Sequence, residues 1–89
     1  MQNKKSEVKI RDIGAFLYKL RKELKLSRNY IAKRASVTTR TIYNIELGRH
    51  TPRIPILARI AAVYDMTLLE LFDSAYLYYA SLAGADLNN

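Results

Sequence analysis

Four side chains with hydrogen-bonding groups share one face of a short helix predicted in the middle of the chain. At about 100° per residue, Ile42 and Ile45 point to one side of this helix and a polar group points to the other. Arginine pairs well with guanine, asparagine with adenine, and threonine with a thymine methyl group or a phosphate. The pattern therefore favours contacts with the base edges of DNA through the outward residues Thr39, Arg40, Tyr43 and Asn44.

The sequence leaves simpler explanations of this face open. Arg40 and Asn44 also suit a solvated helix face, although such faces more often carry Glu and Lys. Tyr43 suits a phosphate contact or surface packing as well as a base contact. Leu47 lies on the same arc, where it contacts a thymine methyl or a sugar, or is simply exposed.

Two short helices must position this face. Ser27 and Thr38 are N-cap candidates, because a hydroxyl can accept from an unpaired backbone N–H in the first turn. They predict helices over residues 27–35 and 38–47, separated by the tight turn Ser36-Val37. A short turn with a small residue holds two such helices at a steep angle, so that the second can enter a DNA major groove. The arrangement predicted is a helix-turn-helix.

Three further helices are indicated around this pair. Pro55 fits the first turn of a fourth helix, and Thr67 with Glu70 has the spacing of a capping box that opens a fifth. Gly48 suits the left-handed residue that ends the helix predicted over residues 38–47. The first helix shows an amphipathic stripe made of Ile13, Phe16, Leu17, Leu20 and Leu24. The fold class expected is all-α, with five helices.

Charge is distributed unevenly along the 89 residues, which suffice for one domain. All 15 lysines and arginines lie between Lys4 and Arg59, with four of the eight acids, whereas the part from Ile60 onward carries only the other four acids. Such polarity suggests one face for a polyanion and one end for another contact. Lysines and arginines that only solvate helices are the alternative.

The composition argues against catalysis. With no cysteine, one histidine and scattered acids, the chain offers no recognisable catalytic arrangement. We therefore expect no enzymatic activity, no cofactor and no metal site. No apolar stretch approaches the ~20 residues that span a membrane, and no secretory signal is evident, so a cytoplasmic location is expected.

With these elements placed, the sequence resembles the XRE family of bacterial and phage regulators, to which the lambdoid repressors and Cro proteins belong. The resemblance runs from about Ile13 to Phe72 and implies a compact five-helix, repressor-like bundle with a short apolar C-terminal segment. It is carried by an ordered set: Leu20-Arg21-Lys22, Ser27, Ile31-Ala32, Val37-Thr38, Thr41-Ile42, Ile45-Glu46-Leu47-Gly48, and Pro52 ahead of Leu57 and Ile60-Ala61.

The resemblance also implies roles for individual positions. Arg21 and Glu46 match a structural ion pair between the first helix and the recognition helix. Lys25 and Ser36 stand where relatives usually have glycine, so a positive φ is expected at either position. Positions near DNA phosphates are matched by Arg28, Thr38, Arg49, His50 and Thr51. For His50, the alternative is that it makes no contact with DNA.

The C-terminal segment is apolar, aromatic and free of Lys and Arg. Tyrosines are enriched at the cores of interfaces, and in the family the region after the fifth helix often joins two subunits. We therefore expect a dimer interface at Tyr76, Leu77 and Tyr79; folding of these residues back onto the chain's own core is the alternative. The domains expected are a flexible basic arm (1–9), a helix-turn-helix domain (10–73) and a C-terminal extension (74–89).

The function predicted is that of a sequence-specific transcriptional regulator, a repressor or an activator. A homodimer would bind an inverted-repeat operator in double-stranded DNA, with helix 39–47 in the major groove. The alternative is an antitoxin or an adaptor, whose C-terminal segment docks a protein partner while DNA binding is secondary.

Overall fold

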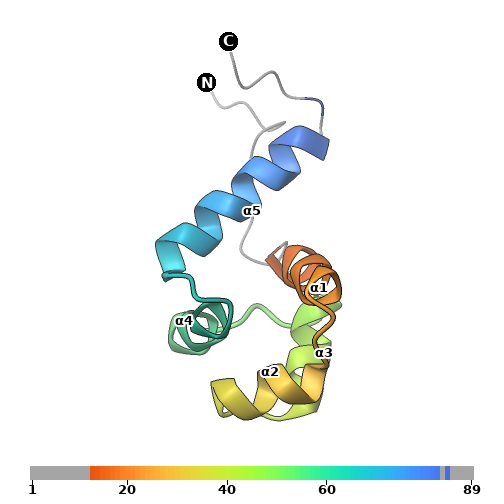
Figure 1. Ribbon diagram of the computed structural model, residues 1–89, viewed down its shortest axis with the longest axis vertical. Coiled ribbons are helices and arrows are strands. Elements are labelled where there is room, and N and C mark those ends of the chain that lie inside the picture. Colours follow the sequence, from red (N-terminus) through yellow and green to blue (C-terminus); the bar gives the residue numbers. More distant parts are fainter. Residues whose placement is uncertain (1–12, 83, 85–89) are drawn as a thin grey trace.

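Five α-helices make up the part of the chain that the computed structural model describes, residues 13–82 and 84. No strand occurs within those residues, which confirms the all-α expectation (Figure 1). The predicted basic arm, residues 1–9, lies outside the described residues. The helices are α1 (Ile13–Glu23), α2 (Arg28–Ala35), α3 (Thr39–Glu46), α4 (Ile54–Val63) and α5 (Leu68–Leu82).

Side chains that cap the helices explain where three of them begin. The Ser27 hydroxyl accepts from the backbone N–H of Tyr30, and the Thr38 hydroxyl accepts from that of Thr41, each at 3.0 Å. Thr67 and Glu70 exchange reciprocal hydrogen bonds of 2.8 and 3.1 Å at the start of α5, as a capping box requires. Each cap satisfies a backbone donor that the first turn leaves unpaired.

Left-handed residues end the helices. Lys25 and Ser36 both have φ of 58°, as the departures from glycine indicated, and Gly48 has φ of 75°. Asp65 after α4 has φ of 60°, which the sequence analysis did not anticipate. A non-glycine residue in this region costs on the order of 1 kcal/mol. The left-handed conformation turns the backbone sharply, and this turn allows the next helix to begin within a few residues.

The core lies where all five helices meet. Helix α2 packs on α3 and α4, α1 packs on α3, and α5 lies across α4 and α1 (Figure 1). Leu24, expected on the apolar stripe of α1, is instead 54% exposed and lies one residue beyond the end of α1 at Glu23. The largest fully buried side chains are Ile13, Ile31, Leu57, Ile60 and Leu71.

Helix α5 continues through residues 73 and 74, where the sequence analysis drew a domain boundary. Ala75 and Ala80 are buried, and the Tyr78 ring lies 5.6 Å from that of Phe16 in α1. The segment 74–82 is therefore packed against the bundle. Among the described residues, none of the helices combines the length and the apolar character needed to cross a bilayer.

Candidate nucleic-acid interface

Helices α2 and α3 form a helix-turn-helix around the left-handed residue Ser36. The N–H of Val37 donates to the Ala32 carbonyl at 3.0 Å, which closes the turn. The Thr39 hydroxyl donates to the Asn29 side-chain oxygen at 3.4 Å, so the first turns of both helices lie side by side. Sequence analysis missed Asn29, because its contact depends on how the two helices cross.

Helix α3 has a buried face and an exposed face. Ile42 and Ile45 are each 2% exposed and belong to the core. Most of the residues predicted to contact bases lie on the exposed side, and Asn44 is half-buried. Exposed members of this face are Thr39, Arg40, Tyr43 and Leu47. The helix therefore presents hydrogen-bonding side chains outward from a fixed base.

Tyr43 is close to two arginines from neighbouring segments. The guanidinium carbon of Arg28, at the start of α2, lies 5.0 Å from the centre of the Tyr43 ring. That of Arg49, in the loop after α3, lies 5.6 Å from the same ring. Both distances are within the range of cation–π contacts. The structure thus brings together three predicted DNA-contacting residues.

The other predicted phosphate-contacting residues do not join this group. Thr38 is exposed, and its hydroxyl is 2.9 Å from that of Thr41 while it caps α3. His50 and Thr51 are exposed in the loop between α3 and α4. Together with Arg53 they line a shallow hollow at the base of α3. This loop is held at one end by Pro52, which is buried.

A buried ion pair lies beneath the exposed face of α3. Arg21 donates from Nε and Nη2 to the two Glu46 carboxylate oxygens, at 2.8 and 3.1 Å. Arg28 Nε donates to the same carboxylate at 3.0 Å. The Arg21 and Glu46 side chains are only 6% and 3% exposed. Glu46 therefore connects α1, α2 and α3 at a single carboxylate.

The pKa values of Arg21 and Tyr64 are both raised in this buried region. Hydrogen bonding to Glu46 raises the pKa of the Arg21 guanidinium, although desolvation opposes the shift. Burial raises the pKa of Tyr64 well above its usual range, and the Glu46 charge adds to this effect. Arg21 also donates to the Leu26 carbonyl at 2.8 Å, so its guanidinium binds both the Glu46 carboxylate and a backbone carbonyl.

Two positioning contacts escaped sequence analysis. Gly14 of α1 packs against the backbone at Ile45 of α3, leaving no space for a side chain. Arg59 of α4 donates from Nε to the Ala35 carbonyl at the end of α2, at 2.8 Å. Both contacts join residues far apart in the chain, so no local pattern reveals them.

The residues predicted to form a dimer interface do not share one environment. Tyr76 and Leu77 are 38% and 47% exposed on α5. Tyr79 is half-buried and packs against the core, as the alternative explanation expected. The available surface on this part of α5 is therefore centred on Tyr76 and Leu77.

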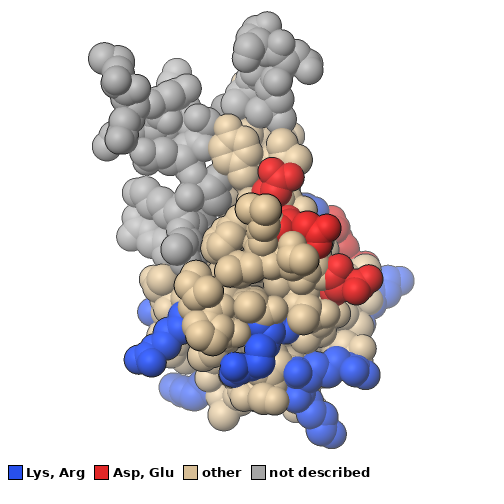
Figure 2. Space-filling view, turned by 90° about the vertical axis from the view of Figure 1, so that its left-hand side faces the viewer, with Lys and Arg blue, Asp and Glu red and all other residues tan. Residues whose placement is uncertain are grey.

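Charges on the surface are separated along the long axis of the molecule. Figure 2 shows acidic side chains on the upper part of one face and basic side chains below them. The described acids beyond residue 60 are exposed on or just before α5: Asp65, Glu70 and Asp73. The basic end is the one that carries the helix-turn-helix.

Comparison with known proteins assigns this arrangement. The helix-turn-helix family matches residues 17–71, from α1 into α5. The chain belongs to the XRE-type helix-turn-helix family. The XRE-type match includes α2, α3, α4 and most of α1, and it points to a DNA-binding domain without enzymatic activity.

A curated relative agrees with the XRE-type assignment. The chain is 31% identical over 75 residues to the HTH-type transcriptional regulator SlrR of Bacillus subtilis (strain 168). The alignment covers 83% of this chain and 49% of the relative, so the chain spans about half the length of that protein. The comparison with solved structures gives no match.

Proposed function

We propose that this chain is a sequence-specific regulator of transcription that binds double-stranded DNA with α3 in the major groove. The observation that carries the proposal is the exposed face of α3, whose polar side chains project from a helix fixed by two buried isoleucines. Thr39 and Arg40 stand at its first turn, the part of a recognition helix that contacts base edges. Asn44 lies one turn further on.

The surrounding cations supply the part of the affinity that does not depend on sequence. The cations Arg28 and Arg49 lie on either side of α3 along the chain and reach toward phosphates, and His50 adds an imidazole N–H donor next to Arg49. Exposed hydroxyls of Thr38 and Thr51 add neutral donors. Neutralised phosphates release counterions, so binding weakens steeply with salt. Phosphate contacts set the register of the protein on the duplex, and base contacts set the sequence.

The proposal includes a homodimer formed through Tyr76 and Leu77. These exposed residues lie in a part of the sequence, from Ile60 onward, that contains no Lys or Arg. A two-fold axis at α5 would present two recognition helices to an inverted repeat. In the cytoplasm, occupation of such an operator represses or activates the adjacent promoter. The alternative occupant of this surface, a protein partner, is an outcome that the test below detects.

Selection of duplexes from a randomised DNA pool tests the proposal. The full chain is incubated with the pool at near-physiological salt, and the bound fraction is sequenced. The expected result is an enriched inverted repeat with half-sites about 10–11 base pairs apart. An enriched single half-site would retain sequence-specific binding and reject the dimer. Unselective binding that disappears steeply with salt would reject the regulator and favour a protein partner on α5.

A further inference from the structure

We propose that Tyr43 is a positioning residue, which orients Arg28 and Arg49 toward DNA phosphates and does not itself select a base. The inference rests on the proposed DNA-binding function and changes the role of one residue within it. The spacing of residues on α3 predicts Tyr43 among the base-contacting side chains. Its contacts in the folded chain assign it to the phosphate-contacting set.

The first observation is the number of cations at one ring. Arg28 and Arg49 lie 5.0 and 5.6 Å from the Tyr43 ring centre, measured from the guanidinium carbons. The quadrupole of an aromatic ring attracts a cation over its face. The two arginines are 21 residues apart in sequence number and belong to α2 and to the loop after α3. Tyr43 is thus the point at which both are held.

The second observation is the position of Arg28. Its Nε donates to the buried carboxylate of Glu46 at 3.0 Å, while its guanidinium faces Tyr43. Glu46 is fixed in turn by Arg21. Arg28 is therefore restrained on two sides, and the side chain is still 33% exposed. Restraint before binding reduces the entropy lost when a long side chain is immobilised against a partner.

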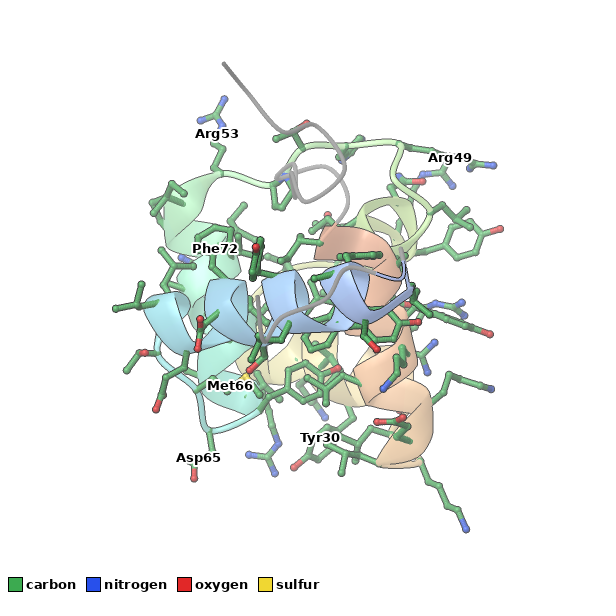
Figure 3. All side chains as sticks on the ribbon, turned by 90° about the horizontal axis from the view of Figure 1, so that it is seen from above. Tyr30, Arg49, Arg53, Asp65, Met66 and Phe72 are labelled. Atoms are coloured by element: carbon green, nitrogen blue, oxygen red, sulfur yellow. The ribbon has the colours of Figure 1, made fainter. Side chains whose placement is uncertain are left out.

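The third observation concerns Arg49. Its backbone N–H donates to the Asn44 carbonyl at 2.9 Å, which fixes the start of the loop against the end of α3. The side chain is exposed and lies near Tyr43. Figure 3 shows Arg49 and Tyr30 on different sides of the molecule. Arg49 therefore lies away from Tyr30, whose ring contacts a different arginine, Arg34.

A base-selecting tyrosine and a positioning tyrosine differ in what their loss changes. A base contact sets preference at one position of the site, whereas a phosphate contact adds to affinity for every sequence and to its salt dependence. Removal of a ring that orients two arginines should weaken binding to all sequences and reduce the salt dependence. It should leave the preferred sequence unchanged.

The test compares variants of the full chain on a duplex recovered by selection and on duplexes changed at each position. Tyr43→Leu removes the ring, and Tyr43→Phe keeps it. The matched control is Tyr30→Leu, because Tyr30 is 39% exposed against 40% for Tyr43 and has Arg34 over its ring at 4.3 Å. The dissociation constant is measured from about 50 to 200 mM salt for each variant. Over this range, the affinity that comes from phosphate contacts falls steeply with salt.

Tyr43→Leu should reduce the slope of log affinity against log salt by about 1 to 2, since each phosphate contact contributes about 0.9. Tyr43→Phe should restore the slope, and Tyr30→Leu should keep that of the unmodified chain. A change of base preference with an unchanged slope would overturn the inference. A chain that selects no sequence before any substitution rejects the proposed function itself, so the two failures are distinguishable.

Discussion

Gly14 in α1 lies directly against the backbone carbonyl of Ile45 in α3. A side chain on Gly14 would overlap the Ile45 oxygen and would lie 2.9 Å from its carbonyl carbon. Because both atoms belong to the backbone, no side-chain rotation relieves the overlap. This contact fixes how closely α1 approaches the recognition helix, and so how the Arg21–Glu46 ion pair between the same helices is aligned.

Substitution Gly14→Ala should destabilise the fold. Overpacking a filled site typically costs about 1–3 kcal/mol and occasionally more, and the rigid neighbour at Gly14 places the expected loss at the upper end. Urea denaturation should show a lower midpoint with an unchanged slope. Gly84→Ala is the comparison: a side chain there meets nothing within 4 Å, but the φ of 74° makes alanine cost about 1 kcal/mol, so the loss at Gly14 should be clearly larger. Equal losses at the two positions would contradict the close-packing argument.

Substitution Glu46→Gln should cost about 3–5 kcal/mol, because it leaves the buried Arg21 charge without its partner. The control is Glu23→Gln, which breaks the exposed Lys19–Glu23 pair of 2.6 Å and should cost less than about 1 kcal/mol. Both values come from urea denaturation. The double variant Arg21→Met with Glu46→Leu should recover much of the loss. A single-variant cost as small as that of Glu23→Gln would show that the pair is solvated.

Stability should fall at alkaline pH through Tyr64. Burial raises its pKa in the folded state above the unfolded value of about 10. The folded chain therefore retains a proton that the unfolded chain loses, and the stabilisation present below pH ~10 decreases as the pH rises beyond it. Free energies of unfolding between pH 8 and 11 should fall more steeply for the unmodified chain than for Tyr64→Phe. Parallel curves would refute this.

Substitution Arg40→Ala should weaken binding to the selected duplex by about 1–3 kcal/mol and relax preference at one base position. The physical reason is that Arg40 is proposed to make a bidentate contact with a guanine edge, which alanine cannot make. Arg34→Ala removes the same charge from the side where Arg34 stacks on Tyr30, and should change affinity less. Titrations against duplexes altered one position at a time measure both effects. A uniform loss for Arg40→Ala would make it a phosphate contact.

Substitution Leu77→Lys should dissociate the proposed dimer, because it places a charge in an apolar contact. Leu24→Lys is the control, since Leu24 is 54% exposed against 47% for Leu77 and lies at the end of α1. Sedimentation at several protein concentrations should give a monomer for Leu77→Lys and a dimer for the control. Dimers in both samples would exclude Leu77 from the interface.

The signals that predicted the fold are local. Ser27 and Thr38 satisfy backbone donors three residues ahead, and an apolar stripe repeats within each helix, so both can be found in a short window of sequence. The left-handed Lys25 and Ser36 were expected because the family resemblance marks those turns. Asp65 has the same conformation without such a guide, and it was missed.

The candidate site was predictable only in part. The exposed face of α3 follows from the spacing of Ile42 and Ile45, because a helix wheel needs no other element. The grouping of Arg28, Tyr43 and Arg49 depends on the crossing of α2 and α3 and on the path of the next loop. Contacts of this kind arise from the tertiary fold, and no sequence window contains them.

The unbroken course of α5 bears on which operators the protein could tolerate. The helix begins at its capping box, is anchored by Tyr78 on Phe16, and reaches Tyr76 and Leu77 without a linker. In a dimer joined there, the distance between the two recognition helices would be fixed, because no flexible segment could lengthen it. One inserted base pair turns a half-site by about 35° around the duplex axis, a mismatch that bending of DNA alone would have to absorb. The protein would therefore accept a single spacer length.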